Sequence, residues 1–71
     1  MQELAAIKPS PGPVLAAERV RLGVSQKDLA ARLGMHRVSL RGWEKSAEVK
    51  PVLAARYVRA LHEIVAKETA A

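Results

Sequence analysis

Cationic side chains are the residues of this sequence best suited to a chemical task. The chain has 12 Lys and Arg against 7 Asp and Glu, which gives a net charge of +5 at pH 7. Guanidinium and ammonium groups donate hydrogen bonds to anions, so this balance favours an anionic partner. Net charge alone does not distinguish nucleic acid from a membrane surface or an acidic protein.

Catalytic and metal chemistry have little support in the sequence. No cysteine is present, which excludes a disulfide framework and a thiolate metal site. The two histidines, His36 and His62, are far apart along the chain. Neither a Ser, His and acid constellation nor a phosphate-binding glycine loop is evident. We therefore expect a protein that is not an enzyme and that uses no cofactor or metal.

Length and hydropathy predict one small domain in the cytoplasm. A chain of 71 residues is near the size at which a single hydrophobic core is marginal, so help from a second subunit is expected. No apolar run is long enough to span a bilayer. Residues 1–7 lack the basic start and long apolar segment of a secretory signal. We expect no membrane partner.

Residues 13–22 are predicted to form the first helix of the domain. The run contains no helix-breaking residue after Pro13, and Leu15, Arg19 and Leu22 fall on one face. Gly23 follows, and glycine readily adopts the left-handed conformation that ends a helix. The helix should therefore turn Leu15 and Leu22 inward and stop before Gly23.

A second helix is predicted to begin at Gln26 and to end at Gly34. Ser25 and Asp28 have the spacing of a capping box, in which a hydroxyl and a carboxylate each satisfy a backbone amide. The helix has a short apolar stripe that can face the core. This stripe consists of Leu29, Ala30 and Leu33.

A third helix is predicted over residues 37–45, after a connection made by Met35 and His36. Leu40 and Trp43 lie three residues apart and form its inner face. Two helices joined by so short a link must cross steeply, and the small side chain of Ala30 permits their close approach. These residue types at these offsets define a helix-turn-helix.

The same stretch resembles the DNA-binding domain of the phage repressor and Cro family, also called the XRE-type helix-turn-helix family. The resemblance covers residues 15–44 and rests on several constraints at once. It is carried by Arg19, Leu22, Gly23, Gln26, Leu29, Ala30, Leu33, Gly34, Leu40, Trp43 and Glu44. It implies an all-α fold class, namely a compact four- to five-helix lambda-repressor-like DNA-binding domain with a central helix-turn-helix and a long C-terminal helix.

The resemblance also implies structural roles for three polar residues. Gln26 matches a glutamine that binds a DNA phosphate and braces the recognition helix. Arg19 and Glu44 match an arginine and a glutamate that form a partly buried ion pair. Charge chemistry independently favours this pair, because a lone arginine on an inner helix face needs a carboxylate partner. The alternative partner, Glu18, is adjacent to Arg19 in the sequence and points elsewhere on a helix.

The exposed side of helix 37–45 is the expected site of base reading. In this motif the N-terminal half of the recognition helix enters the major groove. An arginine there could donate two hydrogen bonds to guanine, and a valine could contact a thymine methyl group. The expected base-reading residues are His36, Arg37, Val38 and Arg41. The expected phosphate-binding residues are Ser25, Gln26, Lys27, Ser39, Lys45 and Lys50.

Three positions depart from the family pattern. Gly42 stands where a longer polar side chain is usual, which removes one base contact but leaves room for the DNA backbone. His36 replaces the usual Ser or Thr at the start of the recognition helix, so a capping role and a DNA contact both stay open. Ser46 replaces a glycine, which leaves the course of the following loop undefined.

Residues 51–67 are predicted to form one long helix, whereas the family often has two. No Gly or Pro interrupts residues 52–67, and Pro51 suits a first helical turn. The second half has more apolar surface than so small a core can use, which favours a twofold dimer interface. Intramolecular packing and docking onto a larger partner are the alternatives. The expected interface residues are Tyr57, Val58, Leu61, Ile64 and Val65.

The domain organisation follows from these elements. Residues 1–12 are expected to be an extended or flexible arm, residues 13–67 the DNA-binding domain, and residues 68–71 a frayed tail. The prolines at positions 9, 11 and 13 each restrain the preceding residue away from helical geometry. The arm could touch DNA, pair across a dimer or be a frayed terminus, and Leu4 and Ile7 are its only indications of docking.

The leading functional hypothesis is a sequence-specific transcription regulator, a repressor that binds an inverted-repeat operator in double-stranded DNA. It would bind as a homodimer with helix 37–45 in the major groove, and its two recognition helices would lie about 34 Å apart. One alternative is an antitoxin that represses its own operon and also binds a toxin. Another is an adaptor that uses the same fold to bind a protein.

Overall fold

A computed structural model describes residues 11–70, with side chains as far as Glu68. These residues form four α-helices, namely α2 (Gly12–Arg21), α3 (Gln26–Leu33), α4 (Arg37–Lys45) and α5 (Pro51–Ala70). The all-α fold with a long C-terminal helix is therefore confirmed. The expectations for residues 1–10, including docking through Leu4 and Ile7, lie outside the described residues.

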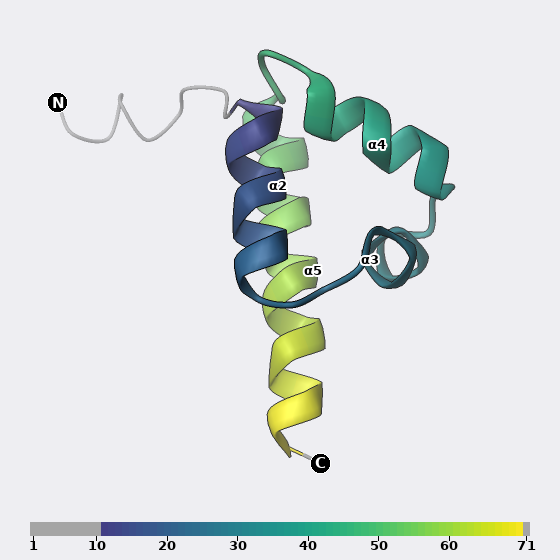
Figure 1. Ribbon diagram of the computed structural model, residues 1–71, viewed down its shortest axis with the longest axis vertical. Coiled ribbons are helices and arrows are strands. Elements are labelled where there is room, and N and C mark those ends of the chain that lie inside the picture. Colours follow the sequence, from purple (N-terminus) through teal and green to yellow (C-terminus); the bar gives the residue numbers. More distant parts are fainter. Residues whose placement is uncertain (1–10, 71) are drawn as a thin grey trace, which may run out of the picture.

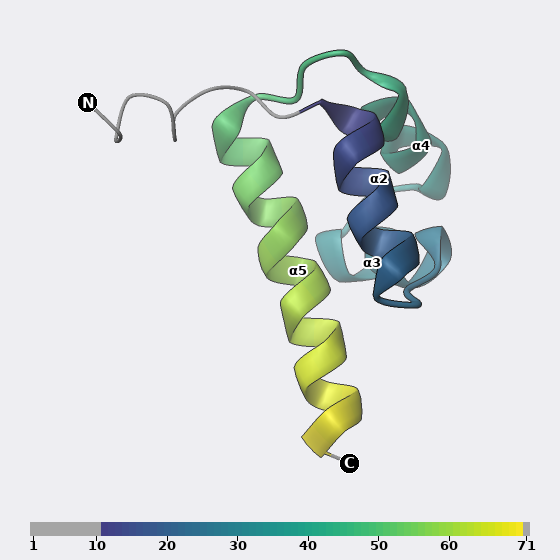
Figure 2. The same ribbon diagram turned by 60° about the vertical axis from the view of Figure 1, so that its left-hand side comes forward.

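Each of the four helices packs against two others. Helices α2 and α5 lie side by side (Figures 1 and 2), α3 packs against α5, and α4 packs against α2 and α3. The C-terminal half of α5 extends beyond the other three helices, as the yellow end of the ribbon in Figure 1 shows. The helix-turn-helix of α3 and α4 is thus supported by α2 and α5.

Local signals set most of the helix boundaries. The backbone amide of Asp28 donates to Ser25 Oγ over 3.0 Å, which caps α3. Gly23 and Gly34 have positive φ angles of 74° and 71°, so each ends the preceding helix in the left-handed conformation. The starts and ends predicted for α3 and α4 agree with the structure, and α2 lies one residue earlier than predicted at each end.

Helix α5 is longer than the sequence analysis expected. It continues from Pro51 to Ala70, past Lys67, because no Gly or Pro follows Pro51 to stop it. Residues 68–70 are therefore helical where a frayed tail was expected. Within residues 11–70, no helix is both long enough and apolar enough to cross a membrane.

The hydrophobic core lies where all four helices meet. Leu29, Leu40, Tyr57 and Leu61 are fully buried in it. The assignment of Tyr57 and Leu61 to a dimer interface is therefore wrong, because both side chains are enclosed within one chain. In a chain without Phe, Tyr57 is the largest fully buried side chain. Val58, Ile64 and Val65 are half-buried and pack against the edge of this core.

The start of α2 packs directly against the end of α4. Gly12 is buried, and its amide donates to the carbonyl of Ser46 over 2.8 Å. A Cβ atom at Gly12 would lie 2.2 Å from the carbonyl oxygen of Trp43 and 2.8 Å from the carbonyl carbon of Glu44. Only glycine allows this approach, which fixes the C-terminal end of α4 relative to α2.

Candidate nucleic-acid interface

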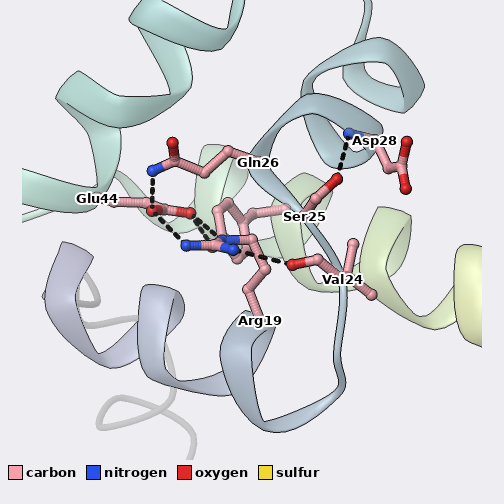
Figure 3. Close-up of polar contacts among 7 residues, drawn as sticks. Arg19, Val24, Ser25, Gln26, Asp28 and Glu44 are labelled. Atoms are coloured by element: carbon pink, nitrogen blue, oxygen red, sulfur yellow. Dashed lines mark hydrogen bonds and ion pairs between the residues drawn. The ribbon is translucent and has the colours of Figure 1, made fainter.

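A buried carboxylate joins α4 to the other three helices. Glu44 of α4 accepts hydrogen bonds from Arg19 of α2, from Nε over 2.8 Å and from Nη2 over 3.2 Å. It also accepts from Gln26 Nε2 of α3 over 2.9 Å and from Tyr57 Oη of α5 over 2.5 Å. Figure 3 shows the side chains of Arg19 and Gln26 converging on Glu44. The network holds α4 in a fixed orientation.

Burial and hydrogen bonding act in opposite directions on Glu44. Burial raises the pKa of this carboxyl, but hydrogen bonds from Arg19, Tyr57 and Gln26 outweigh burial and hold the pKa below its ordinary value. Burial, together with the hydrogen bond to Glu44, raises the pKa of Tyr57. At neutral pH, Glu44 is therefore an ionised acceptor and the hydroxyl of Tyr57 is a donor.

Arg19 pairs with Glu44 and not with its neighbour Glu18. Its Nη1 atom also donates to the backbone carbonyl of Val24 over 2.8 Å, which fastens the loop between α2 and α3 (Figure 3). Glu18 instead accepts from Arg21, at i and i+3 on the exposed side of α2. The structure thus brings together the two residues that the family resemblance pairs.

The outer face of α4 is exposed and carries only positive charge. Leu40 and Glu44 are buried and Trp43 is half-buried. The other residues of the helix are exposed, namely Arg37, Val38, Ser39, Arg41, Gly42 and Lys45. Because Glu44 is the only carboxylate in α4 and points inward, no acidic side chain of this helix offsets its three exposed cations.

Val38 stands out on this face. Its exposed fraction is 75%, the highest among the large hydrophobic residues that the structure shows to be exposed. A β-branched residue has below-average helix propensity, so neither packing within the chain nor helix formation accounts for it. The side chain is free to contact another molecule.

The residues expected to bind phosphate surround α4 on two sides. Ser25, Gln26 and Lys27 lie at the start of α3, and Lys45 and Lys50 flank the loop between α4 and α5. Ser25 Oγ is engaged as the α3 cap, while Lys27, Ser39, Lys45 and Lys50 are exposed. In the described part of the chain, no carboxylate pairs with Lys27, Arg37, Arg41, Lys45 or Lys50.

Gln26 is half-buried between α3 and Glu44. A carboxylate only accepts hydrogen bonds, so the amide nitrogen of Gln26, and not its oxygen, faces Glu44. One N–H of this group bonds to Glu44, and a second N–H is left for another acceptor. The geometry therefore allows Gln26 to brace α4 and to bind an anion at the same time.

The three departures from the family pattern have structural outcomes. His36 is the residue directly before α4. Its side chain makes no capping hydrogen bond and is exposed, so it is available to contact another molecule. No atom lies within 4 Å of a Cβ built on Gly42, so space is open there. Ser46 Oγ donates to the carbonyl of Glu48 over 2.8 Å and accepts from its amide, which defines the loop.

Two features that hold α4 in place were not predicted from the sequence. Tyr57 was assigned to an interface, and the close approach at Gly12 was not foreseen. A signal for Tyr57 existed, because a tyrosine on the inner face of a helix needs a partner for its hydroxyl. Glu44 comes within hydrogen-bonding distance of Tyr57 Oη only once α4 and α5 are packed together, so the partner itself had no sequence signal.

Comparison with known proteins agrees with this architecture. Residues 15–63 match the family described as Helix-turn-helix, a stretch that reaches from α2 into α5 and includes Arg19, Gln26, Glu44 and Tyr57. No curated protein and no solved structure shows significant similarity to the chain. The match covers more than half of the sequence, and the Glu44 network and the exposed face of α4 fall inside it. The chain belongs to the helix-turn-helix family of the phage repressor and Cro type, a family of DNA-binding transcription regulators.

Proposed function

We propose that this protein is a sequence-specific repressor that binds an inverted-repeat operator as a homodimer, with α4 in the major groove. The observation that carries this proposal is the outer face of α4, which presents three unpaired cations and Val38 while its inner face is fixed to the other helices. A rigid helix with a basic, exposed face matches the width of the major groove.

Base reading is assigned to the N-terminal half of α4. Arg37 and Arg41 are one helical turn apart, so both guanidinium groups can point to the same groove. Each can donate two hydrogen bonds to the O6 and N7 atoms of a guanine, and Val38 can contact a thymine methyl group. The Glu44 network supports this role because side chains on a fixed helix lose less entropy on binding.

Phosphate binding is assigned to residues on both sides of α4. Gln26 and Lys27 lie in the first turn of α3, where free backbone amides and the helix dipole favour an anion. Lys45 and Lys50 lie at the other end of the recognition helix. Contacts on both sides would set the register of α4 in the groove without reading sequence. Repression then follows from occupancy of the operator.

The experiment that tests base reading compares variants on two kinds of DNA. A cognate sequence is first selected from a random duplex pool with the wild-type protein. We expect Arg37→Ala or Arg41→Ala to reduce affinity for the cognate duplex by about 5- to 150-fold and to change affinity for random duplex much less. Fluorescence anisotropy at one fixed salt concentration measures both affinities.

The matched control for this experiment is Arg21→Ala. Arg21 is an exposed arginine of α2 that is already paired with Glu18, so its removal changes the net charge equally without touching α4. We expect nearly wild-type affinity for both duplexes. Equal losses on cognate and random DNA for the α4 variants would refute the assignment of base reading to Arg37 and Arg41.

A further inference from the structure

Three arginines line one groove between α3 and α5. The groove has a volume of about 200 Å³ and is lined by Arg32, Leu33, Arg56, Arg59, Ala60 and Glu63. Arg32 comes from the last turn of α3, and Arg56 and Arg59 lie about one turn apart on α5. No residue of α4 lines it. This arginine groove is therefore separate from the surface assigned to DNA.

The arginine groove carries more positive charge than it neutralises. Glu63 is the only carboxylate that lines it. The Oε1 atom of Glu63 accepts from Arg32 Nε over 3.0 Å, and its Oε2 atom lies 3.6 Å from Arg59 Nε. Arg56 is exposed, and no ion pair within the described residues includes it. Three guanidinium groups against one carboxylate leave a net charge of 3 − 1 = +2 in the groove.

The cations of the groove are available to a second molecule. The side chains of Arg32 and Arg59 are 50% and 82% exposed, so their ion pairs with Glu63 lie at the surface. Surface ion pairs contribute little stability, and another carboxylate can replace Glu63 at low cost. Ala60 is buried in the core, so the apolar surface that the groove offers is that of half-buried Leu33. The groove thus combines a basic rim with one apolar contact.

We propose that the arginine groove docks an acidic segment of a different protein. Glutamate or aspartate side chains of this segment bind Arg56, Arg59 and Arg32, and an apolar side chain rests on Leu33. Charge complementarity carries this choice of partner, because a guanidinium group binds a carboxylate through two parallel hydrogen bonds. The inference goes beyond the proposed function, since it adds a protein partner on a surface that DNA does not use.

DNA fits the arginine groove less well than an acidic segment does. Glu63 pairs with both Arg32 and Arg59, and its negative charge repels a continuous chain of phosphates. The separate carboxylates of a peptide can be spaced around it. Leu33 favours an apolar side chain, which a sugar-phosphate backbone lacks. A groove of about 200 Å³ also admits single side chains but not a double helix.

A neighbouring groove shows that this preference is local. It has a volume of about 380 Å³ and lies along the same seam between α3 and α5. Its charged residues are Asp28, Arg32, Glu63, Lys67 and Glu68. Three carboxylates against two cations give it no excess of positive charge. An acidic segment should therefore contact Leu33 in the arginine groove and leave Ile64 in the neighbouring groove unchanged.

Peptide titration of the ¹⁵N-labelled full chain tests this docking site without DNA. The probe is a short synthetic peptide with the repeat Glu-Glu-Leu, blocked at both ends, and its control has the repeat Gln-Gln-Leu. We expect the acidic peptide to bind at low salt with a dissociation constant of about 0.1–1 mM, and the neutral peptide to bind about tenfold more weakly. Changes in amide chemical shift should concentrate at Leu33 and at residues 56–63.

A charge reversal in the groove provides the first variant. Arg56→Glu should weaken binding of the acidic peptide by about tenfold, because it removes one ion pair and creates a like-charge contact. Arg56 is exposed and unpaired, so the fold should tolerate the change. The matched control is Arg21→Glu, which makes the same charge change on α2 and should keep most of the affinity.

Removal of the groove's own carboxylate should have the opposite effect. Glu63→Gln frees Arg32 and Arg59, so it should strengthen binding of the acidic peptide by about threefold. Its matched control is Glu18→Gln, which frees Arg21 on α2 in the same way and should leave the affinity nearly unchanged.

Several results would overturn the docking site. These are no binding of either peptide, equal binding of both, equal losses for Arg56→Glu and Arg21→Glu, and shift changes centred on α4. A larger loss of affinity for a DNA duplex in Arg56→Glu than in Arg21→Glu would also overturn it, because the groove would then contact DNA. If the protein selects no DNA sequence, the proposed function fails while peptide binding at the arginine groove still stands.

Discussion

At the scale of single residues, Glu44 links the folding of this protein to its binding surface. A buried carboxylate is tolerated only where donors replace its lost hydration, and Glu44 has donors from Arg19, Gln26 and Tyr57. The same arrangement removes the only negative charge of α4 from its outer face. One residue therefore both anchors the helix and leaves its exposed face cationic.

The ionisation of Glu44 predicts acid sensitivity. Its pKa in the folded protein lies below the ordinary value of 4.5. A depressed folded-state pKa contributes stability that is fully present above about pH 4.5 and is lost as the pH falls through the folded pKa. We expect Glu44→Gln to lower the free energy of unfolding at pH 7 by about 3 kcal/mol. Between pH 7 and pH 3, the free energy of unfolding of the variant should fall less than that of the wild type.

Urea denaturation at pH 7 and at pH 3 measures this effect. Glu68→Gln is the matched control, since Glu68 is exposed and no ion pair of the described residues includes it. It should leave stability at pH 7 within about 0.5 kcal/mol of wild type. An unchanged pH dependence in Glu44→Gln would show that other carboxylates control the acid response.

At the scale of elements, the position of α4 depends on how closely α2 approaches it. Gly12 contacts the backbone at the end of α4, and Gly34 lets the chain turn from α3 into α4. Hydrogen bonds to Glu44 then fix the rotation of α4 about its axis. The recognition helix is thus held at its start, along its inner face and at its end.

Two glycine substitutions should have opposite effects on stability. Gly12→Ala would place a methyl group 2.2 Å from the carbonyl oxygen of Trp43, so α2 must move and the free energy of unfolding should fall by about 1–3 kcal/mol. Gly42→Ala meets no atom within 4 Å and improves the helix propensity of α4, so it should stabilise by up to about 1 kcal/mol.

Thermal unfolding followed by circular dichroism compares the two glycine variants under identical conditions. The Gly42→Ala variant also tests DNA binding, because Gly42 lies on the exposed outer face of α4. If Gly42→Ala stabilises the fold but weakens binding to the selected duplex, the DNA backbone or a base approaches that position closely. Equal stability of both variants would contradict the close approach at Gly12.

At the scale of the whole molecule, charges are segregated. Arg19, Arg21, Arg32 and Arg59 each face a carboxylate within the chain. The cations on and around α4 do not, and neither do Arg56 and Lys67 of α5, so within the described residues α4 is one of two places where cations are left unpaired. Such a surface attracts polyanions over a distance and orients them toward the recognition helix.

This segregation predicts the salt dependence of DNA binding. Phosphate contacts by about three to five of the unpaired cations give a slope of about −3 to −5 in a plot of log affinity against log salt for one half-site. Lys50→Ala should reduce the magnitude of the slope by about one and weaken selected and random DNA alike. Arg21→Ala should leave the slope unchanged, and a loss for Lys50→Ala confined to selected DNA would refute its assignment to phosphate.

Much of this protein could be predicted from the sequence because the deciding interactions are local. Ser25 and Asp28 cap α3 through adjacent groups, and Gly23 and Gly34 end helices through their own backbone conformation. The pairing of Arg19 with Glu44 was predicted from the family resemblance. The sequence of one helix does not determine which residue of another helix it will contact. The bounds of α4, and hence the candidate reading face, needed no tertiary information.

What only the tertiary structure decided is the division of α5 between core and surface. Its apolar residues share similar spacing, so the sequence assigned Tyr57 and Leu61 to the same interface as Ile64. Packing rotates α5 so that Tyr57 reaches Glu44 and Ala60 and Leu61 enter the core, while Arg56, Arg59 and Glu63 stay exposed. The sequence by itself determined the helices and the cationic face of α4, because caps and periodicity act over a few residues. The rotation of α5 was decided by contacts between residues far apart in the chain.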